Sequence, residues 1–214
     1  MEEVKVKAKV PTDWNDITLE TYLKYKKNID LYKDDEDEDD MIDKSIIIAL
    51  DILCGIAPSY ATQMPIELLN HVMDTLNNFM QKSEYNLQRI ITIDNVEYGF
   101  EPNLSNMAYG AYLDISKFDK IGIDKNWPKI MSILYRPVLS KSGKLYDIKE
   151  YTGMEDETPF LKTTMDTNFG CIGFFLTIHH DLARYTLKSL KAGEETQLLL
   201  KSITEKNGVV IPQS

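Results

Sequence analysis

Two short runs of β-type residues, each interrupted by a two-residue turn, constrain the fold of this chain most. The run RIITIDNVEYGF at residues 89–100 places Asp94 and Asn95 between two such stretches. Both residue types tolerate the positive backbone φ angles that tight hairpin turns need. The run RPVLSKSGKLYDIKEY repeats the arrangement around Ser142 and Gly143. The sequence therefore predicts two β-hairpins.

The first part of the chain has a different periodicity. Residues 18–82 carry apolar residues at the spacing of amphipathic helices, with Thr18 as a predicted N-cap and Gly55 as a predicted stop signal. Pro65 is expected at the first position of a third helix. Before these helices, residues 4–10 (VKVKAKV) alternate apolar and basic side chains, which is the period of a β-strand. A lone strand must pair either within this chain or with a neighbouring one.

Three more helices are expected in the second part of the chain, followed by a short fourth helix over residues 194–204. Ser105 and Asn126 are predicted N-caps, and Thr164 is predicted to begin a long C-terminal helix. The expected fold class is therefore α+β, mainly α-helical with two short β-hairpins. Residues 1–88 form the predicted N-terminal strand and helical region, and residues 89–214 form the predicted hairpins and remaining helices. We expect one compact unit.

The composition narrows the classes of ligand. The 214 residues are 43% hydrophobic and 27% charged, an ordinary globular balance. The 34 acidic and 24 basic side chains give a net charge of −10, which repels phosphate backbones and makes nucleic acid an unfavourable partner. The longest apolar run, residues 169–178, is shorter than the ~20 residues that span a bilayer, so no membrane span is expected.

Residues 34–40 (DDEDEDD) form an acidic run that cannot pack into a core. A solvated loop is one interpretation, and a metal-binding or electrostatic docking loop is the other. An EF-hand would need spaced ligands with a central glycine, which this run lacks. We expect an acidic loop just before a helix, where its charge favours the helix N-terminus.

No catalytic signature is present. The sequence contains neither GxSxG nor GxxxxGK[ST] nor GxGxxG, and its three histidines, His71, His179 and His180, lack the HExxH spacing. Cys54 and Cys171 lie within apolar stretches and are expected to be buried free thiols. We therefore expect no catalytic residue, no cofactor and no metal, and a protein that is not an enzyme.

Residues 96–115 (VEYGFEPNLSNMAYGAYLDI) are rich in aromatic side chains. They predict a hairpin folded onto a helix, with most of the rings, including Phe100, filling the joint between them. Tyr109 or Tyr112 is expected to face a partner instead, because a tyrosine hydroxyl needs water or an acceptor and tyrosine is enriched in interfaces.

Several segments together resemble a known family. They are VPTDWNDITLETYLKY, VEYGFEPNLSNMAYGAYLDI, NWPKIMSILYRPV, YDIKEYTG and DTNFGCIGFFLTIHHDL. The chain resembles small proteins of tailed phages of gut Bacteroidales, including crAss-like phages, and of marine phages. These proteins are described as tail assembly chaperones or baseplate-type assembly proteins. The resemblance covers most of residues 10–185 and excludes the acidic run and the tail after residue 190.

The resemblance implies a non-enzymatic phage protein of the virion or its assembly, either a tail-associated structural component or packaged cargo. Its expected partners are tail, portal or baseplate components, with a homo-oligomer left open. Its expected location is the virion, or the host cytoplasm during assembly. A transient chaperone absent from the mature particle is one alternative, and a phage-encoded enzyme or host-directed effector delivered with the genome is another. The predicted partner-binding residues are Tyr98, Tyr109, Tyr112 and Trp127.

Overall fold

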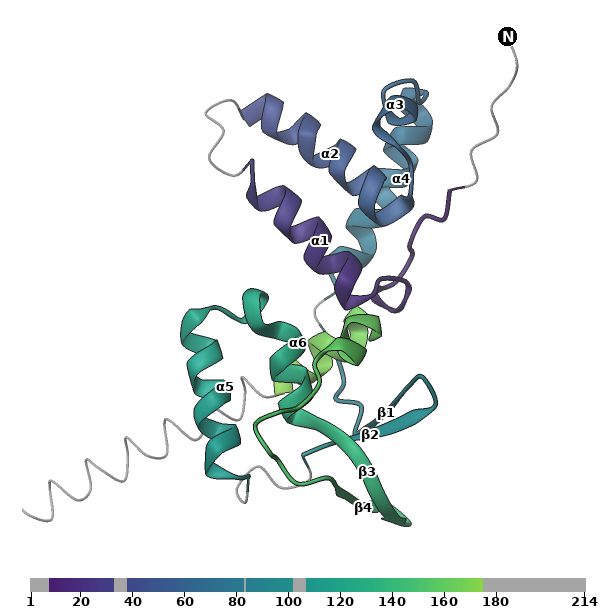
Figure 1. The fold of residues 1–214 in the computed structure, drawn as a ribbon. Coiled ribbons are helices and arrows are strands. Elements are labelled where there is room, and N and C mark those ends of the chain that lie inside the picture. The colour runs from purple at the N-terminus through teal and green to yellow at the C-terminus, as the bar shows by residue number, and fades with distance from the viewer. Residues whose placement is uncertain (1–7, 33–37, 83, 102–106, 175–214) are drawn as a thin grey trace, which may run out of the picture. The chain divides into compact units, whose positions relative to one another are not determined.

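The computed structural model describes residues 8–32, 38–82, 84–101 and 107–174 (Figure 1). The chain divides into two compact units, Met1–Cys171 and Ile172–Ser214. Nearly all described residues belong to the first unit. Most of the predicted N-terminal strand, the first residues of the acidic run, Ser105 and the chain after residue 174, with His179 and His180, lie outside the described residues.

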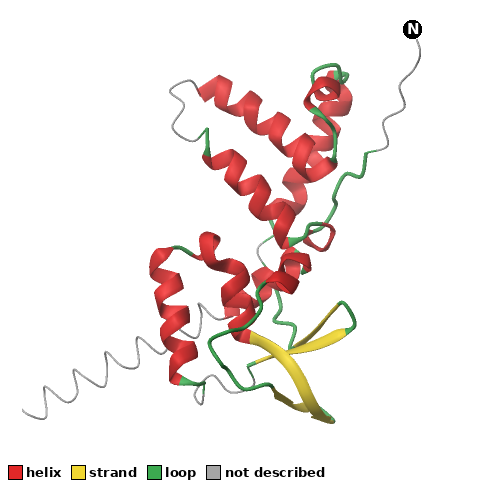
Figure 2. Ribbon diagram, viewed as in Figure 1, coloured by secondary structure: helices red, strands yellow, loops and turns green. Residues whose placement is uncertain are grey.

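Seven α-helices and one four-stranded antiparallel sheet make up the described chain, which confirms the predicted, mainly helical α+β class with two hairpins (Figure 2). The helices are α1 (Leu19–Asp30), α2 (Glu38–Cys54), α3 (Pro58–Ala61), α4 (Ile66–Met80), α5 (Tyr109–Ile121), α6 (Ile123–Leu134) and a seventh that begins at residue 165. The strands are β1 (Ile90–Ile93), β2 (Val96–Phe100), β3 (Tyr135–Ser142) and β4 (Leu145–Ile148). Two short 3₁₀ helices are η1 (Trp14–Asp16) and η3 (Thr158–Lys162).

The first hairpin forms where the sequence predicts it. Ile93 pairs with Val96, which leaves Asp94 and Asn95 as the two turn residues. Their φ angles are 49° and 65°, the left-handed region that a tight hairpin turn requires. This hairpin is therefore confirmed, together with its turn.

The second hairpin is confirmed, but its predicted turn is wrong by one residue. Ser142 pairs with Leu145, so the turn consists of Gly143 and Lys144 rather than Ser142 and Gly143. Gly143 has a φ of 62° and so occupies the first turn position, where a hairpin favours glycine. Strand β3 also pairs with β2, which joins both hairpins into one sheet in the order β1-β2-β3-β4.

Several predicted helix ends are confirmed. The Thr18 hydroxyl accepts the Thr21 N–H at the start of α1, and Gly55 follows α2 with a φ of 68°. Thr164 directly precedes the seventh helix, and its carbonyl accepts the Asn168 N–H at 3.1 Å. These side chains and this glycine end or begin helices for the reasons that the sequence suggests.

Two predicted N-caps are wrong. Helix α6 begins at Ile123, after Gly122, so Asn126 lies inside the helix and its amide donates to the Gly122 carbonyl at 3.3 Å. Helix α5 begins at Tyr109, four residues beyond the predicted cap at Ser105. In α6 the burial of one helix face, which includes Trp127, outweighs the local preference of Asn126 for a cap.

Three smaller features also differ from what the sequence predicts. Pro65 is the N-cap of α4 rather than its first residue, and the short helix α3 was not expected. Helix α2 begins at Glu38, so the end of the acidic run belongs to the first turn of the helix rather than to a loop before it. Carboxylates in that turn favour the helix dipole.

A cluster of aromatic rings joins the helices of the first unit. The Trp14 ring meets Phe79 of α4 at 5.1 Å and Phe169 of the seventh helix at 4.9 Å, edge to face. Tyr22 of α1 meets Trp127 of α6 at 5.7 Å. Rings from residues 1–88 and from residues 89–171 thus share one core.

Gly170 is required by a close backbone contact on the seventh helix. A Cβ atom at this position would lie 2.9 Å from the carbonyl carbon of Asn86, and closer still to its oxygen. A Cβ at Gly173 would meet nothing within 4 Å among the described residues. The segment before β1 therefore packs against the helix at Gly170 only because that residue has no side chain.

We expect Gly170→Ala to lower the free energy of unfolding by about 1–3 kcal/mol, because the backbone around Asn86 must move. Gly173→Ala is the matched control on the same helix, and its added methyl group should leave stability equal or slightly higher. Chemical denaturation of both variants measures the difference. Equal effects of the two substitutions would contradict the close contact.

Candidate partner-binding site

Helix α5 presents apolar side chains on two faces. Ala111 and Ile115 are fully buried, and α5 packs against α6. Tyr109, Tyr112 and Leu113 follow the spacing of one turn on a different face of the helix and are exposed. An ordinary surface helix needs one apolar face only, so the second face requires an explanation.

The exposed face of α5 carries three large side chains that are accessible to solvent. Tyr109 is 74% exposed, Tyr112 40% and Leu113 47%. We call these three residues the α5 surface. Ile121, at the end of the helix, is also exposed two turns beyond Leu113. Tyrosine is enriched at protein interfaces because its ring is apolar and its hydroxyl is polar.

The other side of α5 is fixed by the segment that follows β4. The Tyr151 hydroxyl donates a hydrogen bond to the Asp114 carboxylate. The Tyr151 ring also lies close to Gly110, where an added Cβ would be 3.4 Å from the ring. Burial, and then the Asp114 carboxylate, raise the pKa of Tyr151, so this hydroxyl stays protonated as a donor. The close approach to α5 at Gly110 is thus made by Tyr151.

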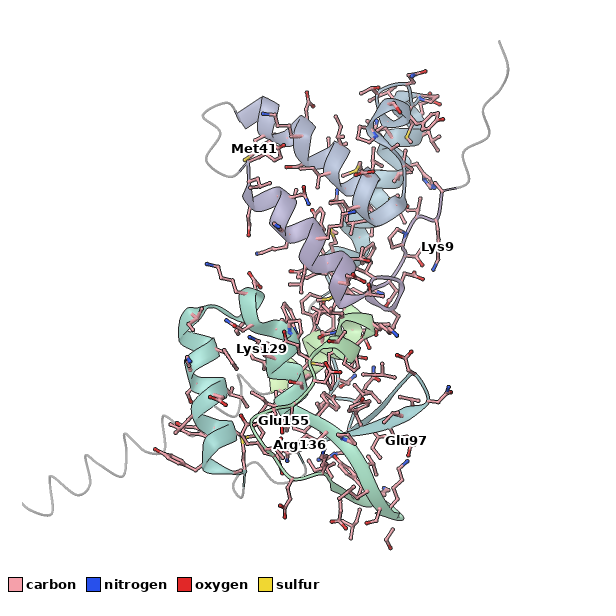
Figure 3. All side chains as sticks on the ribbon, viewed as in Figure 1. Lys9, Met41, Glu97, Lys129, Arg136 and Glu155 are labelled. Atoms are coloured by element: carbon pink, nitrogen blue, oxygen red, sulfur yellow. The ribbon has the colours of Figure 1, made fainter. Side chains whose placement is uncertain are left out.

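Tyr98 lies in a different setting from the α5 surface. It is half-buried on β2, and its ring meets Phe160 at 5.3 Å, edge to face. It lines a cavity of about 220 Å³ together with Arg136 and Glu155, which are labelled in Figure 3. Burial raises the pKa of Tyr98, and the carboxylates of Asp156 and Asp94 add to the shift.

Trp127 lies inside the protein rather than on its surface. It is 4% exposed and packs in the aromatic core with Tyr22 and Phe169, each at a ring distance of 5.7 Å. A side chain in that position cannot meet a partner without opening the core. We therefore leave Trp127 out of the proposed partner surface.

The first hairpin packs against rings of the second hairpin, whereas the sequence predicts that its rings pack on a following helix. Phe100 is in the core, as predicted, but its ring packs on Tyr135 of β3 at 5.4 Å. Tyr146 of β4 covers Gly99, where an added Cβ would be 2.5 Å from the ring. The Tyr146 hydroxyl donates to the Phe100 carbonyl at 2.7 Å. These rings come from the second hairpin, whose contacts residues 96–115 alone could not reveal.

The thiols are placed as the sequence predicts. Cys54 and Cys171 are free and buried. Burial raises the pKa of Cys54 to about 11 and also raises that of Cys171. A protonated thiol is a poor nucleophile, so neither cysteine is activated in this conformation.

Other kinds of site can be assessed only within the described residues. In that part of the chain, no three His, Cys, Asp or Glu side chains gather as they would around a metal ion. None of the described helices combines the length and the apolar character needed to cross a membrane. The absence of a cofactor and of catalysis stays a prediction.

Comparison with known protein families, with curated proteins and with solved structures gives no significant match to this chain.

The sequence indicated Tyr109 and Tyr112 but missed Leu113, which completes the α5 surface. The signal was present as the spacing of residues 109, 112 and 113, three and four positions apart. The bond between Tyr151 and Asp114 spans 37 positions, and no local pattern predicts it.

Proposed function

We propose that this chain is a non-enzymatic bacteriophage protein of the virion or of its assembly, acting through contacts with other phage structural proteins. The observation that carries the proposal is the α5 surface, formed by Tyr109, Tyr112 and Leu113. The family resemblance supplies the phage context, and the partners would be tail, portal or baseplate components.

The chemistry of the α5 surface supports protein contact more than small-molecule binding. Its residues lie on the outside of a helix, and none of them lines the cavity of about 220 Å³ beside Tyr98. A helix with exposed aromatic and aliphatic side chains one turn apart is the element that partner grooves accommodate. Aromatic side chains are also the usual centres of binding energy in such interfaces.

We expect the double variant Tyr109→Ser/Leu113→Ser to lower the yield of complete particles and the co-purification of tail proteins. If one of these residues is a binding hot spot, its loss of about 2 kcal/mol corresponds to about 30-fold weaker binding. The unfolding midpoint of the free protein should stay within about 2 °C, because these side chains are exposed. The measurement is complementation of a phage that lacks the gene, paired with thermal unfolding.

Tyr60→Ser is the matched control, since Tyr60 is an exposed tyrosine on the short helix α3. Its particle yield should equal that of the unaltered protein. Normal yield with the double variant would contradict a role for the α5 surface, and a large loss of stability would show that these side chains pack in the core.

A further inference from the structure

A cavity of about 390 Å³ lies beside the free edge of strand β1. The strand stands at the end of the sheet order and pairs only with β2 among the described residues. The opposite wall is formed by residues of η3 and of the start of the seventh helix, and η3 contacts β1. Small-molecule sites usually have volumes of about 300–1,000 Å³, a range that this cavity reaches and the cavity of about 220 Å³ beside Tyr98 does not.

Main-chain groups of β1 are available to a ligand in this cavity. Arg89 and Phe100 form a hydrogen-bonded pair, in which the Phe100 N–H donates to the Arg89 carbonyl at 2.8 Å. Antiparallel pairs alternate, so Ile90 and Thr92 form non-hydrogen-bonded pairs with β2. Their N–H and C=O groups therefore point to the open edge, where both residues line the cavity. Each of them offers one donor and one acceptor.

Side chains around the cavity add polar groups that carry no charge. Thr164 and Thr167 line the opposite wall, and their hydroxyls are 3.2 Å apart. A hydroxyl has one donor and two acceptor positions, so this pair retains capacity for further hydrogen bonds. Gln88 donates its amide N–H to the Asp166 carboxylate at 3.1 Å, and its side-chain oxygen has no partner among the described residues.

The charges of the lining are already compensated. Asp94 and Lys162 are its only charged side chains, and they form an ion pair with each other. A charged ligand therefore finds no unpaired counter-ion in the lining, and the net charge of −10 of the whole chain further disfavours anions. Hydrogen bonds rather than charge must select what binds here.

We propose that this cavity binds a neutral polyhydroxylated compound of the size of a monosaccharide. Each hydroxyl of such a compound both donates and accepts, so neighbouring hydroxyls can bond the N–H and the C=O of one residue of β1. The buried Ile91 and Ile93 also line the cavity and provide apolar surface for the C–H groups of a sugar ring.

The two polar walls favour a polyol over a peptide strand. A strand added to the edge of β1 would spend its main-chain groups on β1 and would meet Thr164 and Thr167 with side chains only. A sugar ring carries hydroxyls around its whole circumference and can bond both walls at once. The polar character of the wall opposite β1 is thus the observation that decides between the two.

Saturation-transfer NMR on the full-length protein tests the proposal, with D-glucose, D-galactose, N-acetyl-D-glucosamine and myo-inositol as separate probes. We expect at least one probe to bind with a Kd of about 1 mM, the strength usual for a ligand of about twelve heavy atoms. It should shift the amide signals of Ile90 and Thr92, because these N–H groups face the cavity. A tetrapeptide of alternating threonine and valine is the rival probe.

Two variants remove polar groups of the cavity and keep the shape of the side chain. Gln88→Met and Thr167→Val should each weaken binding about 3- to 10-fold. Thr62→Val is the matched control, since Thr62 is exposed at the end of α3 and does not line the cavity, and it should bind like the unaltered protein. Thermal unfolding checks each fold. Gln88 is exposed, so Gln88→Met decides alone if Thr167→Val is unstable.

Three results would overturn the proposal: no probe binds, binding is unchanged in Gln88→Met and Thr167→Val, or the tetrapeptide shifts the amides of Ile90 and Thr92 while no sugar does. The last result would make the edge of β1 a site for peptide strands instead. The inference does not depend on the proposed function, because the α5 surface is tested by particle yield with variants outside this cavity.

Discussion

Replacing Phe100 with alanine is expected to lower the free energy of unfolding by about 3–5 kcal/mol, the usual effect of a large-to-small change in a core. The Phe100 side chain is 2% exposed, and its ring packs on Tyr135, its partner across β2 and β3. The cavity left behind would lie between strands that pair at this point, so the surroundings can collapse only in part. In a chain of this size the unfolding midpoint should fall by about 6–20 °C.

Val96→Ala is the control on the same strand, because Val96 is an exposed apolar residue of β2. Its effect should stay within about 1 kcal/mol. Thermal and urea unfolding of the two variants, measured side by side, give the comparison. An unchanged midpoint for Phe100→Ala would mean that this face of β2 is not in the core.

The second large effect is expected at the buried ion pair between Glu101 and Arg136. Both side chains are nearly fully buried, and Arg136 also donates to the Ile133 carbonyl at 3.2 Å. Removing one partner leaves a buried charge without its counter-ion, which costs about 3–5 kcal/mol. We therefore expect Glu101→Leu and Arg136→Met each to destabilise the protein by that amount.

The double variant Glu101→Leu/Arg136→Met separates the contribution of the ion pair to stability from the contribution of side-chain packing. Two apolar side chains of similar volume often replace a buried ion pair without loss, so the double variant should be more stable than either single variant. Urea denaturation of all four proteins completes the cycle. Strictly additive losses would show that the two charges do not stabilise each other.

Local sequence chemistry predicts those parts of the fold in which one or two residues decide the backbone. Asp94 and Asn95 form the turn of the first hairpin because both accept positive φ angles, and the structure has them at 49° and 65°. Thr18 begins α1 because its hydroxyl accepts an N–H of the first turn. Neither feature depends on distant residues.

Features set by tertiary packing are not predictable in this way. Asn126 is a good N-cap by local preference, yet α6 begins three residues earlier and carries Pro128 in its interior. The helix buries Trp127, Ile130 and Met131, and this burial decides its limits. Strand β3 follows α6 directly at Tyr135, a junction without a loop that no turn signal marks.

The same distinction between local pattern and tertiary packing applies to the candidate partner-binding residues. The spacing of Tyr109 and Tyr112 indicates that they share one face of a helix, and this much follows from the sequence. That Trp127 is inside the core depends on rings contributed by α1 and the seventh helix, more than 40 positions away in either direction along the chain. Exposure is a property of the assembled unit, so the sequence could name candidates but could not separate Tyr109 from Trp127.

Site-specific crosslinking in infected cells tests the central claim most directly. A photoreactive phenylalanine analogue at position 109 should form an adduct that mass spectrometry identifies as a tail, portal or baseplate protein of the same phage. The same analogue at position 60, the exposed tyrosine of α3, should give no such adduct. Adducts at both positions, or none with a phage structural protein at position 109, would contradict the claim that the α5 surface binds a partner in the particle.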